Sequence, residues 1–142
     1  MTFTHTSFNS PVEIGTRVAL ILTSLDLPLG LDELVILDYA LLYSKEFGGP
    51  ENLHPALPNH LAEIAHRREV IPRSLSFLSR RGLIRMLVDD TGYYYCANEC
   101  TTDFVSCLQS PYYKKSWARL NWISENREKV LSTKILELKS LS

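Results

Sequence analysis

The run LVILDYALLY, residues 34–43, is apolar on nearly every side when it is placed on a helix. The longer segment 31–47 predicts one helix, ended by the Gly-Gly-Pro sequence that follows it. A helix that is apolar all round is stable in water only when other elements cover all of its faces. The chain is therefore predicted to pack several other elements around this helix.

Asp38 is the single charged residue inside this apolar run. A carboxylate buried among apolar side chains must be paired or neutralised. Arg17, the only basic residue of a helix predicted over residues 11–25, is the expected partner, and His54 is the second candidate. A structural ion pair between Arg17 and Asp38 is favoured over a catalytic role for Asp38.

Further elements are predicted on both sides of this run. The helix over residues 11–25 has Ser10 as its candidate N-cap and a periodic apolar face. Residues 48–59 contain three prolines and two glycines and predict a connector. After residue 98 we expect a short helix, followed by a long helix that ends at about residue 131.

Residues 59–98 predict a winged helix-turn-helix. A short helix near residue 60 and a longer helix beginning at Ile71 would be joined by a tight basic turn. Pro72 suits only the first turn of the second helix. Residues 83–98 predict a strand, a turn and a strand, which would form the β-hairpin wing. In helix-turn-helix proteins the second helix enters the major groove of DNA.

The second helix of this motif has an apolar side and a basic side. Ile71, Leu75 and Leu78 form the apolar side and are predicted core residues. The candidate residues for binding DNA or a partner are Arg67, Arg68, Arg73, Ser76, Phe77, Arg80, Arg81 and Arg85. Arginine pairs with phosphates and guanine edges, and also with an acidic protein surface. Phe77 either extends the core stripe from Val70 or, if it is exposed, favours a protein contact.

Charge is divided into blocks along the chain. Residues 60–85 have a net charge of +4 and residues 111–142 also +4, whereas residues 1–59 have −5 and residues 86–110 have −4. Such blocks predict separate electrostatic faces, one of which could meet phosphate or an acidic partner. The whole chain has a net charge of −1, which argues against a protein that mainly coats nucleic acid.

No motif for catalysis or metal binding is found. The sequence has no G-x-S-x-G, P-loop or H-E-x-x-H, so no catalytic residue is assigned and no enzyme is expected. Cys96, Cys100 and Cys107 lack the paired C-x2-C spacing of zinc modules, so neither a metal nor a cofactor is expected. Apolar runs are far shorter than the roughly 18 to 20 residues of a membrane span, and no secretory signal is recognised. These features predict a cytoplasmic protein that does not enter the membrane.

Trp122 is a candidate interface residue in the last predicted helix. Tyr113, Trp117 and Leu120 share one side of that helix, whereas Trp122 falls away from it. A tryptophan outside a core stripe belongs either to a protein interface or under another segment of the chain. The tail after residue 131 is one segment that could cover it, and both alternatives remain open.

These predictions define an α+β protein that is mainly α-helical. A winged helix-turn-helix core with a β-hairpin wing is flanked by N-terminal and C-terminal helices. Residues 1–142 are expected to form a single domain. Its parts are an N-terminal helical pair with the connector over 8–58, the winged helix over 59–98 and the C-terminal helices over 99–142.

Four segments resemble the small middle component of bacterial ABC three-component systems. They are FNSPVEIGTRVALIL, LVILDYALLYSKEFGGPENLHPALP, the block RRE…SRRGLI and SPYYKKSWARLNWI. The same family supplies LmuC-like subunits of Lamassu defence against phages and plasmids. The resemblance extends from about residue 8 to residue 130.

The resemblance implies a non-catalytic accessory subunit. In such systems an SMC-like (Rad50-like) ATPase senses foreign DNA, and a separate effector, commonly a nuclease, attacks it. The small subunit would bridge these partners through its winged helix, with non-specific contact to double-stranded DNA as a further expectation. The residues alone leave an alternative, a free-standing dimeric winged-helix transcriptional regulator that binds a palindrome.

Overall fold

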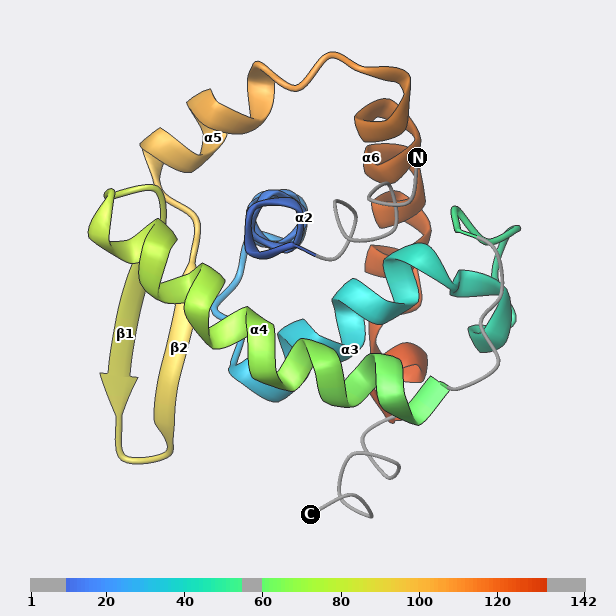
Figure 1. The fold of residues 1–142 in the computed structure, drawn as a ribbon, viewed down its shortest axis with the longest axis horizontal. Helices are drawn as coiled ribbons and strands as arrows, with labels where there is room; N and C mark the ends of the chain where they lie inside the picture. The colour runs from blue at the N-terminus through green and yellow to red at the C-terminus, as the bar shows by residue number, and fades with distance from the viewer. Residues whose placement is uncertain (1–9, 55–59, 133–142) are drawn as a thin grey trace.

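The computed structural model describes residues 10–54 and 60–132. They form a mainly helical α+β fold with one two-stranded antiparallel hairpin, as the sequence predicts (Figure 1). In chain order the elements are α2 (Pro11–Leu25), α3 (Leu31–Leu42), the 3-10 helix η1 (Ser44–Phe47), α4 (His60–Arg80), β1 (Arg85–Asp89), β2 (Gly92–Cys96), α5 (Glu99–Ser106) and α6 (Pro111–Glu125).

Helix α2 is the central element of the fold. It contacts α3, α4, α5 and α6, and Figure 1 shows it nearly end-on with the other helices around it. Its residues from Ile14 to Leu22 are all buried. The Ser10 hydroxyl accepts the backbone N–H of Glu13 at 3.2 Å, which confirms the predicted start of this helix.

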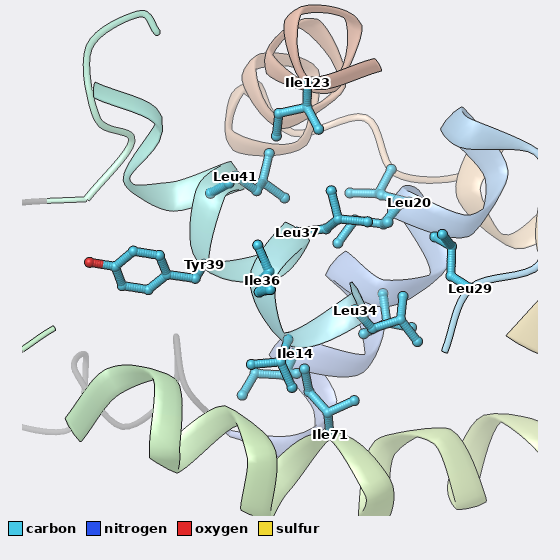
Figure 2. Packing of buried hydrophobic residues seen from close by; sticks show 14 of the residues in the cluster. Ile14, Leu20, Leu29, Leu34, Ile36, Leu37, Tyr39, Leu41, Ile71 and Ile123 are labelled. Atoms are coloured by element: carbon cyan, nitrogen blue, oxygen red, sulfur yellow. The ribbon is translucent and has the colours of Figure 1, made fainter. Parts of the chain in front are cut away.

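Helix α3 is buried on all sides, as its apolar sequence predicts. Every residue from Leu34 to Leu42 is buried, and the helix packs against α2, α4 and α6. Figure 2 shows apolar side chains of α3 pointing to different neighbours, toward Ile71 of α4 and Ile123 of α6 among them. The chain then leaves through η1, which ends at Gly48 with φ 80°, a left-handed conformation that glycine adopts without strain.

The largest difference from the sequence prediction lies in α4. Residues 60–80 form one continuous helix, so the predicted tight turn before Ile71 is wrong and Pro72 lies inside the helix. Pro72 is exposed, and the helical hydrogen bond that its ring removes therefore lies on the solvent side. The arginines and glutamate that precede it are good helix formers and continue the helix.

The apolar stripe of α4 runs along its whole length. Ile64 in the first half is buried, as are the predicted core residues Ile71, Leu75 and Leu78 in the second half. This stripe packs α4 against α2 and α3. Burial of the stripe, rather than local sequence signals, accounts for a single helix over this segment.

The β-hairpin follows α4 at the predicted place. Its register pairs Arg85 with Cys96 and Asp89 with Gly92. Leu29, between α2 and α3, also pairs with Tyr95 through two backbone hydrogen bonds of 2.9 Å. This bridge joins β2 to the helical part of the fold.

The C-terminal helices begin as the sequence predicts. Ser110 accepts the backbone N–H of Tyr113 at 3.4 Å and caps α6. Helix α6 ends at Glu125, and residues 127–132 are helical again after a turn at Asn126. The single helix predicted to about residue 131 is thus interrupted at Asn126, and the tail after residue 132 lies outside the described residues. Within the described part of the chain, no helix is both long enough and apolar enough to cross a membrane.

Candidate functional site

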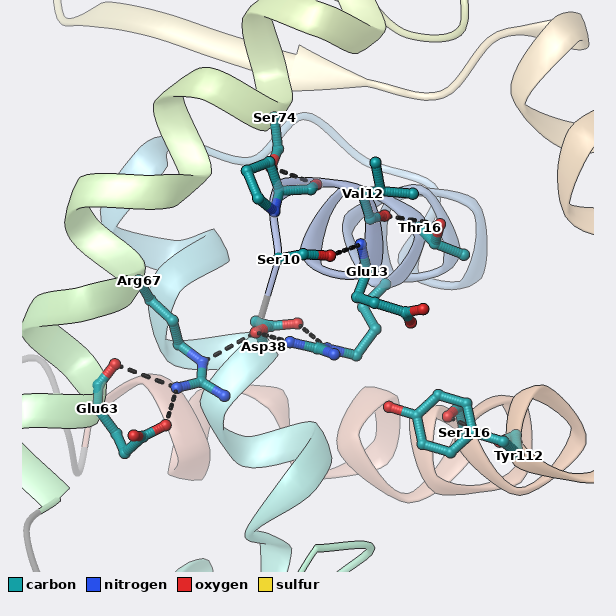
Figure 3. Close-up of polar contacts among 12 residues, drawn as sticks. Ser10, Val12, Glu13, Thr16, Asp38, Glu63, Arg67, Ser74, Tyr112 and Ser116 are labelled. Atoms are coloured by element: carbon teal, nitrogen blue, oxygen red, sulfur yellow. Dashed lines mark hydrogen bonds and ion pairs between the residues drawn. The ribbon is translucent and has the colours of Figure 1, made fainter. Parts of the chain in front are cut away.

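Asp38 lies in the core, where it binds arginines from two other helices (Figure 3). Arg17 of α2 donates from Nε to Oδ1 at 2.7 Å and from Nη2 to Oδ2 at 3.1 Å. Arg67 of α4 donates from Nε to Oδ2 at 2.8 Å. All three side chains are 0% exposed. The ion pair expected from the sequence, Arg17 with Asp38, is therefore present, and Arg67 is an additional partner.

Arg67 has a different position from the one that the sequence suggested. The sequence predicts it on the binding surface, but its side chain is buried, and its Nη1 also donates to the carbonyl and carboxylate oxygens of Glu63 at 3.1 and 3.0 Å. In a continuous helix, Arg67 follows Ile64 by three residues and precedes Ile71 by four, so it lies on the apolar stripe. A single helix over residues 60–80 therefore predicts the buried position of Arg67.

The charges of this buried cluster support one another. Burial by itself would raise the pKa of Asp38, but Arg17 and Arg67 outweigh it and hold that pKa below its usual value. Burial opposes the charge on Arg17, and Asp38 overcomes this and raises the pKa of Arg17 above its usual value. Because both Asp38 oxygens accept guanidinium hydrogen bonds, the carboxylate is a poor proton acceptor and is suited to joining three helices.

His54 lies beside the buried cluster, next to two tyrosine side chains. Its imidazole is 6.3 Å from the ring of Tyr43 and 6.1 Å from the ring of Tyr112, between centroids. Burial lowers the pKa of His54 to about 4, and the positive charges of Arg17 and Arg67 lower it in the same direction. His54 is therefore neutral at pH 7 and does not compete with the arginines for Asp38.

The second half of α4 and the residue after it carry a stripe of exposed side chains, which we call the basic surface. It consists of Arg73, Ser76, Phe77, Arg80 and Arg81, at spacings of three and four residues. Phe77 is 41% exposed, and the guanidinium of Arg81 lies 4.4 Å from the centroid of its ring. No ion pair to Arg73, Arg80 or Arg81 occurs within residues 10–54 and 60–132.

The other predicted binding residues lie apart from this surface. Arg68 is half-buried and donates to Asp32 of α3 at 2.8 Å, so its charge is already paired. Arg85 is exposed at the start of β1. Val70 is buried whereas Phe77 is not, so the alternative in which Phe77 extends the core stripe is wrong.

Trp117 differs from its predicted position in the core, whereas Trp122, for which the sequence left two alternatives open, lies partly under another segment. Trp117, on the predicted core side, is 38% exposed and borders a hollow of about 580 Å³ between α2, α5 and α6. Trp122 is half-buried, and its indole lies so close to Gly49 that a Cβ atom there would be 2.6 Å from Cη2. The connector after η1 therefore covers part of Trp122.

The described residues contain no group of three or more histidine, cysteine, aspartate or glutamate side chains placed to hold a metal ion. Cys96 is buried, Cys100 and Cys107 are exposed, and all three are free thiols. The basic surface and the exposed residues of the hairpin are candidate binding surfaces.

A model of the ABC-three component (ABC-3C) system Middle Component 2 family matches residues 7–140. The chain therefore belongs to this family and is a middle component of an ABC three-component system, a defence-associated complex. The family name implies other components of such a system as partners. Neither a curated protein nor a solved structure matches the chain.

Proposed function

We propose that this middle component is a non-catalytic accessory subunit that holds an SMC-like ATPase and a nuclease effector together, in a Lamassu-type, LmuC-like role. The observation that carries this proposal is the basic surface. Arginine and aromatic residues are enriched among the side chains that dominate protein interfaces. Exposed arginines that have no ion pair within the described part of the chain, around an exposed Phe77, suit an acidic, partly apolar patch on a partner subunit.

The order of elements supports a winged-helix module whose helices differ from those expected. Helices α2, α3 and α4 precede the hairpin, and Leu29 pairs with Tyr95 through an isolated antiparallel bridge. In this assignment α4 takes the place of the recognition helix and β1 with β2 takes the place of the wing. The basic surface is then the exposed side of the recognition helix.

Non-specific contact with double-stranded DNA is a second use of the same surface. Arginines neutralise phosphates without reading base sequence, and such binding weakens steeply as salt displaces it. The dimeric transcriptional regulator is the alternative function, in which α4 would read bases in the major groove. An accessory subunit would co-purify with the other components of the system, whereas a regulator would bind DNA without them.

The test is reversal of charge on the basic surface in the complete system. The variant Arg73→Glu/Arg80→Glu is co-expressed with the other components. The amounts of these components that co-purify with the variant are measured, together with protection against phage. We expect the other components no longer to co-purify with the variant, and protection to be lost. The melting temperature should not change, because both side chains are exposed. The matched control is Lys114→Glu/Lys115→Glu, which makes the same change in charge at exposed positions of α6.

Four results would each contradict a part of this proposal. Wild-type protection and full recovery of partners with Arg73→Glu/Arg80→Glu would exclude the basic surface. Equal loss in the Lys114→Glu/Lys115→Glu control would reduce the effect to net charge. A homodimer that shifts DNA from its own promoter and recovers no other component would favour the regulator. DNA affinity that does not change with salt concentration would exclude a phosphate-driven contact.

A further inference from the structure

The outer edge of β1 has no partner strand among residues 10–54 and 60–132. Its sheet contains only β1 and β2, and Figure 1 shows β1 at the outside of the molecule with no helix beyond it. All residues of β1 are exposed, including Met86 at 47%, Leu87 at 38% and Val88 at 63%. Proteins rarely leave an apolar edge strand open, because its unpaired backbone groups bind another strand.

The register identifies the backbone groups that point outward. In an antiparallel pair, alternate residues bond to the partner strand, and the residues between them direct N–H and C=O to the opposite edge. Tyr95 is a residue of the second kind, since its N–H and C=O both bond to Leu29. Met86 is opposite Tyr95 and Val88 is opposite Tyr93. Met86 and Val88 therefore direct their N–H and C=O groups to the outer edge of β1.

We propose that this edge pairs with β1 of a second copy of the chain, which gives a four-stranded antiparallel sheet across a two-fold axis. The strand sequence Arg-Met-Leu-Val-Asp is self-complementary in that arrangement. With Leu87 on the axis, Met86 is opposite Val88 of the other copy, and Arg85 is opposite Asp89 of the other copy. Each Met86–Val88 pair brings together outward-pointing groups and can exchange two hydrogen bonds.

The charges at the two ends of β1 favour a second copy of β1 as the partner strand and favour this antiparallel register. Edge strands are commonly protected by charged residues or proline, whereas β1 has one cation and one anion placed symmetrically about Leu87. Antiparallel pairing puts each cation opposite an anion, which stabilises the pair. Parallel pairing would put Arg85 opposite Arg85, and a shift by one residue would misalign the outward-pointing groups.

The contact is independent of the proposed function, because it uses residues 85–89 and leaves the basic surface on α4 accessible. Symmetric pairing of identical patches is the commonest form of association between copies of one chain. Two strands of five residues bury far less area than a standard protein interface. The dimer is therefore weak and depends on protein concentration.

A disulfide across the two-fold axis tests the proposal directly. In a background with Cys100→Ser and Cys107→Ser, Leu87→Cys places two thiols at directly opposed positions, where Cβ atoms are within reach of a disulfide. The control is Met86→Cys, which has similar exposure but is offset from its counterpart by two residues. Under mild oxidation we expect the Leu87→Cys chain to form covalent dimer at least about ten times faster than the control.

A second variant separates association from folding. Val88→Pro removes an N–H that points outward, and an edge strand tolerates proline at such a position. We expect this variant to keep its melting temperature and to remain monomeric in sedimentation at concentrations where the parent chain dimerises. Combined with Leu87→Cys, it should also slow cross-linking to the rate of the Met86→Cys control.

The proposal is overturned by equal cross-linking of the Leu87→Cys and Met86→Cys chains. It is also overturned if Val88→Pro leaves dimerisation unchanged. A chain that is monomeric at every accessible concentration, and whose β1 amides gain protection from hydrogen exchange only when another component is added, assigns the edge to that component instead.

Discussion

The two halves of α4 use arginine in opposite ways. Arg67, in the first half, is 0% exposed and contacts Asp38 at 2.8 Å and Glu63 at 3.0 Å. Arg80, in the second half, is exposed and has no ion pair among the described residues. The side of the helix on which each arginine lies makes the difference, because one side packs against α2 and α3. Residue type alone therefore does not distinguish a structural arginine from one available to a partner.

The energetic consequences of the two positions also differ. A buried charge has lost its hydration and depends on its partner, so removal of that partner leaves an uncompensated charge. An exposed charge remains hydrated, and its removal changes little in the folded chain. Single substitutions in the buried cluster should therefore lower the stability of the fold, whereas single substitutions in the basic surface should weaken binding to a partner.

The largest effect is expected for Asp38→Asn. The substitution leaves Arg17 and Arg67 buried without a counter-charge and should lower the free energy of unfolding by about 3 to 5 kcal/mol. Urea denaturation at pH 7 measures it. The matched control is Asp32→Asn, which removes a carboxylate that is 61% exposed from its pair with Arg68 and should cost about 0 to 1 kcal/mol. Equal losses in both variants would refute the structural role of the cluster.

An intermediate effect is expected for His54 as pH falls. Its pKa is lowered from 6.5 to about 4 by burial, so between these values the unfolded chain binds a proton that the folded chain does not. The contribution of His54 to stability is therefore present above pH 6.5 and is lost as pH falls toward 4. Urea denaturation at several pH values should show this loss in the wild type and a flatter profile in His54→Gln.

The lowered pKa of Asp38 keeps this measurement separate from the titration of that carboxylate. The pKa of Asp38 is held below its usual value of 3.8, so its contribution is lost only at more acidic pH. Identical slopes for the wild type and His54→Gln between pH 6.5 and 4 would contradict the predicted burial of the imidazole.

The smallest effect is expected for Arg80→Ala. The side chain is exposed and unpaired within the described part of the chain, so the free energy of unfolding should change by no more than about 0.5 kcal/mol. Arg67→Ala on the same helix serves as the comparison and should be several times more destabilising. A large loss of stability in Arg80→Ala would show that the two halves of α4 do not differ as described.

Much of the fold follows from local patterns in the sequence. The cap at Ser10 and the hairpin after α4 were predicted with nearly correct bounds, and the helix predicted over residues 31–47 ends at Leu42 and is followed by the 3-10 helix η1. The core positions Ile71, Leu75 and Leu78 were also correct. These features depend on periodicity, capping and turn chemistry, which act over a few residues.

The predicted turn in α4 failed for a physical reason. Pro72 is a strong local signal against a helix interior, but one lost hydrogen bond is outweighed by burial of the stripe on both sides of it. Because of the predicted turn, Arg67 was assigned to the surface, and its role as the second partner of Asp38 was not predicted.

The sequence by itself determined the fold class, the helices around the apolar run and the membership of the Middle Component 2 family. The tertiary structure separated the buried arginine from the exposed ones, because it showed that residues 60–80 form a single helix. Arg67 is buried because Asp38, 29 residues earlier and on another helix, lies within 2.8 Å of it. Arg73, Arg80 and Arg81 remain exposed because their side of α4 meets no other described element. A local pattern predicts which side of a helix is apolar, but which charged side chains become buried beside it depends on how the helices pack together.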